Sequence, residues 1–144
     1  MEMEIQLKRY IRYLFGTSFL VFVLNKLIIR SWLIENDAAD IFLIITYSIP
    51  NLIEAIFGII ILTGILIYIR QKFNHTLGAV KNSSINILAL CIASIYVITQ
   101  ELKFHNLGGN NVFDPYDLIA SIIGLLATSC TIQLFGFTEK RNDS

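Results

Sequence analysis

Four stretches of the chain are each long and apolar enough to cross a lipid bilayer, and this limits the fold more than any other feature. A spanning helix needs about 20 mostly apolar residues, because the hydrocarbon layer is about 30 Å thick and each helical residue rises about 1.5 Å. The stretches cover residues 10–29, 41–69, 84–100 and 116–137. They predict an all-α fold, an integral membrane four-helix bundle, with residues 1–144 forming a single transmembrane domain.

The composition agrees with a membrane location. Hydrophobic residues make up 55% of the chain and charged residues 15%, whereas a soluble domain has about 25% charged residues. The mean hydropathy is +0.65. The formal net charge is zero, and the sequence has no basic stripe interleaved with aromatic residues, so we expect no nucleic-acid partner.

The second stretch is longer than a simple span requires. Its 29 residues would form a helix of about 43 Å, and Pro50 inside it lacks a backbone N–H. We expect a kink at Pro50, with residues 41–49 forming an interfacial or re-entrant piece and residues 51–69 the main span. A single tilted helix, kinked but unbroken, is the alternative.

Lysine and arginine are distributed unevenly between the two ends of the predicted spans. Because cytoplasmic loops are enriched in these residues, the chain is predicted to cross the bacterial cytoplasmic (inner) membrane with both termini in the cytoplasm. Eight lie on the predicted inner side: Lys8, Arg9, Arg12, Arg70, Lys72, Lys81, Lys140 and Arg141. Three lie on the outer side: Lys26, Arg30 and Lys103.

Glu54 is the first candidate for a binding residue. It lies four residues after Pro50, and an ionised carboxylate inside a membrane helix must face protein or water. Asn51, Glu54 and Gly58 are spaced to share one helix face. We interpret Glu54 and Asn51 as part of a polar pocket, and the structural alternative is a carboxylate that snorkels or is protonated within the bundle.

Three further acids lie at the predicted outer ends of the third and fourth spans. Glu101 ends the third span, where a charged residue is also ordinary. Asp114 precedes Pro115 and is a good candidate for the N-cap of the last helix, which would explain it structurally. Asp117 is less easily explained in that way.

A stripe of small and polar residues follows Asp117 down the last predicted helix. Ser121, Gly124 and Thr128 share one face with it, and such a stripe lets another helix approach closely. Asp117 is therefore expected to face the bundle. Arg30 is expected to pair with Glu54 or Asp117, because a desolvated carboxylate needs a cation.

The sequence contains no motif that would identify an enzyme. It has no glycine-rich phosphate loop, no HExxH and no GxSxG. Cys91 and Cys130 lie within apolar runs, and His75 and His105 fall on opposite predicted sides of the membrane. We therefore expect no metal site, cofactor or catalytic residue, and the pattern favours ligand binding over catalysis.

The third and fourth spans resemble the VanZ-like family of small multi-helix bacterial membrane proteins. That family typically has a Glu near the end of one helix, a short glycine-containing loop and a D-x-x-D-like start to the last helix. The matching residues are Glu101, "LGGNN", and "DPYDLIASIIG" with Asp114, Asp117 and Gly124. The chain departs from the family pattern at Phe104, Asn110, Ser121 and Thr128.

Two functions follow as hypotheses. The resemblance implies an envelope protein linked to glycopeptide (teicoplanin) resistance, which would bind an envelope lipid or a lipid-linked precursor through the acidic pocket at the outer leaflet. The alternative is a non-catalytic subunit or effector that forms homo-oligomers or assembles with other membrane proteins, as in a defence or secretion system. In that case the small-residue stripe would be a subunit interface and the acids only solvated helix ends.

Overall fold

The computed structural model describes residues 6–101 and 114–139, and every regular element in those ranges is helical. This confirms the predicted all-α class. The elements are α1 (Arg9–Leu24), a π-helical segment η1 (Asn25–Ile29), α2 (Arg30–Glu35), α3 (Asp40–Lys72), α4 (Asn74–Leu77), α5 (Asn82–Glu101) and α6 (Pro115–Phe135). The first three continue directly into one another.

Four helical stretches are long and apolar enough to cross a membrane, and they make the chain a multi-pass membrane protein by length and composition. Many large apolar side chains lie on the outer surface, including Leu134 at 80% exposure and Leu27 at 68%. Such a surface would be an aggregation hazard in water but is suited to contact with lipid. The stretches are Arg9–Glu35, Asp40–Lys72, Asn82–Gln100 and Pro115–Phe135.

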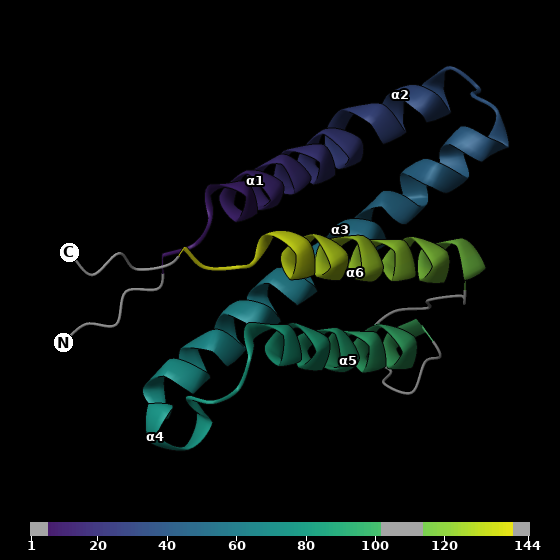
Figure 1. The fold of residues 1–144 in the computed structure, drawn as a ribbon. Coiled ribbons are helices and arrows are strands. Elements are labelled where there is room, and N and C mark those ends of the chain that lie inside the picture. Colours follow the sequence, from purple (N-terminus) through teal and green to yellow (C-terminus); the bar gives the residue numbers. More distant parts are fainter. Residues whose placement is uncertain (1–5, 102–113, 140–144) are drawn as a thin grey trace.

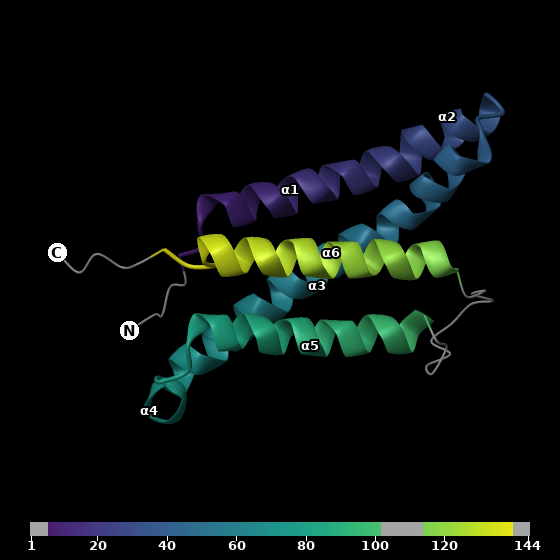
Figure 2. The same ribbon diagram turned by 45° about the vertical axis from the view of Figure 1, so that its right-hand side comes forward.

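Helix α3 is the central element of the bundle and contacts every other helix. Its 33 residues make it about 50 Å long, and it crosses diagonally behind α6 (Figures 1 and 2). A helix longer than the bilayer is thick is accommodated by tilting. Pro50 lies inside α3, so the expectation of a separate re-entrant piece at residues 41–49 is wrong and the alternative of one unbroken helix is correct.

The core lies where α3 meets α5 and α6. Ile59 of α3 and Ala89 of α5 have no exposed surface. Gly124 of α6 lies so close to α3 that a Cβ built on it would be 2.5 Å from the Leu52 carbonyl oxygen and 3.0 Å from the Ala55 Cβ. Small residues thus set the separation of α3 and α6, as is usual where membrane helices pack closely.

The segment before α1 and the segment after α6 lie side by side and are joined by hydrogen bonds. The backbone N–H of Lys8 donates to the Phe137 carbonyl at 3.1 Å, and that of Glu139 donates to the Gln6 carbonyl at 3.0 Å. The Tyr10 hydroxyl donates to the Gly136 carbonyl at 2.7 Å. Both ends of the described chain therefore lie at the same end of the bundle, as an even number of crossings requires.

Candidate functional site

Glu54 lies well inside the bundle's span and is not at a helix end. The Ser121 hydroxyl of α6 donates to the Asn51 carbonyl of α3 at a long 3.5 Å, which places Asn51 about 9 Å below the start of α6. Glu54 is one turn further along α3. Because α5 and α6 are each about 30 Å long, Glu54 lies in the part of the bundle that hydrocarbon would surround.

Glu54 is exposed at the surface of the bundle, and its carboxylate lies near the phenol of Tyr96 on α5. Tyr96 is also exposed, at 55%. Glu54 and Tyr96 thus place two polar side chains on a surface of the bundle where Ile92 and Ile95 of α5 are also exposed. A carboxylate at such depth is costly unless a further donor or cation reaches it.

Asp117 faces inward, as expected, and is half-buried near the start of α6. One of its carboxylate oxygens, Oδ1, is buried and has no hydrogen-bond partner among the described residues. An unpaired buried acceptor is destabilising by about 1–3 kcal/mol or more when charged. Asp117 therefore holds a buried acceptor near the outer end of α6 that no donor among the described residues satisfies.

The other predicted acids have simpler positions. Asp114 is the N-cap of α6, since its Oδ1 accepts from the Tyr116 backbone N–H at 2.9 Å, which agrees with the structural interpretation. Glu101 is the last residue of α5, but its side chain lies outside the described part of the structure. Lys103 and His105 also lie outside it.

Arg30 packs on an aromatic ring and not against an acid. Its guanidinium carbon lies 3.9 Å from the centre of the Tyr47 ring, a cation–π contact between α2 and α3. Its Nε is buried without a hydrogen-bond partner. The expected pair with Glu54 or Asp117 is not found among the hydrogen bonds of the described residues, because Arg30 is held by α3 one turn above Asn51.

The small-residue stripe of α6 packs inside the chain. Ser121 and Thr128 are each 3% exposed, and Gly124 touches the α3 backbone. The stripe was one possible subunit interface in the assembly hypothesis, and this part of that hypothesis is wrong, since α3 of the same chain covers it. Any contact with another protein must use a different surface.

Sequence reasoning missed a buried amide on the first span. Asn25 is 1% exposed and donates from Nδ2 to the Thr46 carbonyl of α3 at 2.9 Å. It is the first residue of the π-helical segment. The available signal was the asparagine itself, a polar residue in the middle of an apolar run.

A second missed group joins α5 to α6 near the opposite end of the bundle. Asn86 is 2% exposed, and its Nδ2 donates to the Ser129 carbonyl at 2.9 Å and to the Ser129 hydroxyl at 3.1 Å. It also reaches Gln133 Oε1 at 3.2 Å. Gln133 in turn bonds Ser83. This network fixes the packing of two helices and needs no ligand to do so.

The candidate acids are distributed over two helices. Within residues 6–101 and 114–139 no group of three or more histidine, cysteine, aspartate or glutamate side chains could hold a metal ion. The hollow between α1 and α3 and a smaller one beside Thr63 are not lined by Glu54, Asn51, Asp114 or Asp117. Glu54 is exposed on α3 beside Tyr96, whereas Asp117 is half-buried on α6.

No protein-family model, curated protein or solved structure matches this chain.

Proposed function

We propose that this chain is a non-catalytic subunit of an assembly in the bacterial cytoplasmic membrane, and that Glu54 binds a transmembrane helix of another chain. The observation that carries the proposal is the exposed carboxylate of Glu54, beside Tyr96, at a depth where lipid offers no hydrogen-bond donors. The partner helix supplies a hydroxyl, amide or cationic side chain at that depth. This interaction relieves the desolvated charge.

Several features support assembly over an outer-leaflet lipid site. Lipid head groups lie at the interface, whereas Glu54 lies about 8–13 Å inside the ends of α5 and α6. A lipid-linked pyrophosphate would carry negative charge and be repelled by both Glu54 and Asp117. The lysine and arginine distribution predicts that both termini lie in the cytoplasm.

The proposal is tested by photocrosslinking from the surface beside Glu54. Ile92 lies one turn from Tyr96 on the same face of α5 and is 40% exposed, so a photoreactive residue at position 92 samples the partner. We expect a discrete protein product in native membranes that is lost on Glu54→Leu. Leu126, which is 52% exposed near the middle of α6, is the control position expected to label lipid alone.

Stability separates the proposed role from a purely structural one. If Glu54 serves a partner, Glu54→Leu leaves the isolated chain as stable or more stable in detergent, because an exposed acid is removed from a lipid-facing surface. If Glu54 serves the fold through Tyr96, then Glu54→Leu and Tyr96→Phe lower the melting temperature together. A position-92 product that persists in Glu54→Leu would contradict the proposal.

A role at the cell envelope, as the VanZ-like resemblance implies, is the second candidate, and Asp117 is the residue that favours it. Asp117 is half-buried near the outer end of α6, the level at which head groups lie, and its buried Oδ1 has no hydrogen-bond partner among the described residues. Changing Glu54, Glu101 and Asp117 singly to their amides and measuring teicoplanin susceptibility tests this role. Wild-type susceptibility in all three variants would rule it out.

A further inference from the structure

An apolar groove runs between α1 and α3, at the end of the bundle where the chain ends meet. It encloses about 490 Å³, within the roughly 300–1,000 Å³ of typical small-molecule sites. Its floor is made by Ile11 and Phe137, which are only 1% and 2% exposed. Ile60 and Gly64 of α3 form one wall.

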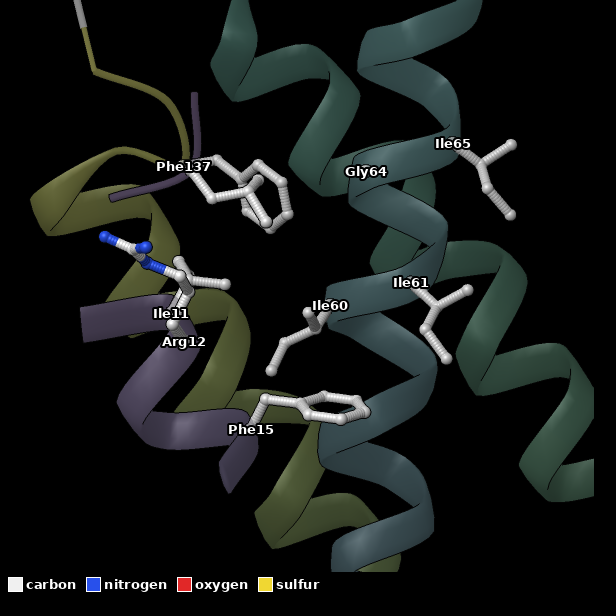
Figure 3. A pocket seen from close by; sticks show the side chains of 9 residues that line it. Ile11, Arg12, Phe15, Ile60, Ile61, Gly64, Ile65 and Phe137 are labelled. Atoms are coloured by element: carbon white, nitrogen blue, oxygen red, sulfur yellow. The ribbon is translucent and has the colours of Figure 1, made fainter. Parts of the chain in front are cut away.

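The groove is closed at one end and open to the side. Phe15 of α1 stacks on Phe57 of α3, with ring centres 4.4 Å apart, and Figure 3 shows the Phe15 ring below Ile60. Ile61 and Ile65 line the rim and are about half exposed. Because these residues belong to spanning helices, the opening faces the hydrocarbon of the bilayer and not water.

Arg12 is the charged residue that lines the groove. Its side chain is exposed, and Figure 3 shows its guanidinium extending away from Phe15 and Ile60. It lies one turn into α1 from Arg9, which is also exposed. An arginine so close to a helix end keeps its charge at the membrane surface while its stem covers apolar residues.

We infer that this groove holds an acyl chain of an anionic phospholipid, with the phosphate bound by Arg12. The apolar floor and walls suit a hydrocarbon tail, which would lie against the half-exposed side chains of Ile61 and Ile65. The cationic rim suits a negative head group. The lysine and arginine pattern assigns this end to the cytoplasmic leaflet, where anionic lipids are concentrated.

Native mass spectrometry of the full chain, released from detergent with added phosphatidylglycerol or phosphatidylcholine, tests the site. We expect phosphatidylglycerol to be retained in preference to phosphatidylcholine. Arg12→Gln should reduce that preference about fivefold, the effect of one basic residue at an anionic surface. Lys72 is an exposed cation at the end of α3 and does not line the groove. The control variant Lys72→Gln should therefore leave the preference for phosphatidylglycerol unchanged.

A second variant fills the groove. A Cβ at Gly64 would make ordinary contact with the Phe137 ring at 3.6 Å, so Gly64→Leu extends into the space, and loss of both lipids is expected. Gly58→Leu is the control on the same helix, where a Cβ meets nothing within 4 Å. Should Gly64→Leu be unstable, Ile65→Trp fills the groove from its rim.

Equal retention of the two lipids by the wild-type chain would overturn the inference, and so would lipid retention unchanged by Gly64→Leu and Ile65→Trp. A groove-filling variant that converts a dimer to a monomer without altering lipid binding would also overturn it, because the occupant would then be a second copy. These outcomes are independent of Glu54, which lies on a different part of α3.

Discussion

Asn25 donates a 2.9 Å hydrogen bond to the carbonyl oxygen of Thr46, the residue four positions before Pro50. In an uninterrupted α-helix the N–H of residue 50 would bond that carbonyl, but proline has none. The acceptor lies in an apolar region, where a free carbonyl is costly. The first span thus supplies from a side chain the donor that the second span lacks, and α3 continues through its proline.

Replacing Asn25 with leucine should destabilise the chain by about 1–3 kcal/mol, because the buried Thr46 carbonyl loses the donor that the Asn25 side chain supplies. The cost should fall in a Pro50→Ala background, where the alanine N–H restores the helical bond. A double-mutant cycle from unfolding in detergent micelles measures this coupling. Asn36→Ala, which removes an exposed bond to the Trp32 carbonyl at 2.8 Å, is the control, and equal costs of Asn25→Leu in both backgrounds would refute the explanation.

Gly124→Ala should destabilise the bundle by about 1–3 kcal/mol, since the added methyl group would overlap the α3 backbone and force α3 and α6 apart. Gly58→Ala should be neutral or stabilising by up to about 1 kcal/mol, because alanine favours helix and the Cβ meets no neighbour. Thermal unfolding of the two variants in the same detergent gives the comparison. A neutral Gly124→Ala would show that the helices are not held at this distance.

Asn86→Leu should loosen the contact between α5 and α6 and lower stability by about 1–2 kcal/mol, the upper range for hydrogen bonds between membrane helices. Hydrogen exchange of α5 amides should rise near residue 86 more than near Ala93. Asn82→Ala removes an exposed partner of Arg70 and should have little effect. Similar exchange in the two variants would argue that the Asn86 network contributes nothing.

The predicted orientation can be checked by cysteine labelling. Maleimide reacts with a hydrated thiolate, so Cys91 and Cys130, which face outward from spanning helices, should resist a membrane-impermeant reagent. With both changed to alanine, Asp37→Cys should react in intact cells and His75→Cys only after permeabilisation. The reverse pattern would place the termini outside.

The division of the chain into spans could be predicted from the sequence alone, because hydrocarbon thickness and the need to satisfy backbone groups leave few ways to fold apolar runs of this length. Asp114 was also predictable, since its N-cap role depends only on its neighbour Pro115. It could not be predicted from the sequence that residues 41–49 continue into the same helix as residues 51–69. Whether a proline ends a helix depends on a donor from elsewhere, and Asn25 is 21 residues away from Thr46 in the sequence.

The sequence by itself determined the helical class, the number of membrane crossings and the small-residue face of α6. Only the tertiary structure decided what each polar side chain meets: Ser121 contacts the α3 backbone, Glu54 turns outward beside Tyr96, and Arg30 packs on Tyr47. The physical reason is that the spanning of a bilayer depends on local composition and length. The partner of a buried polar group depends on the tilt and rotation of helices that are distant in the chain.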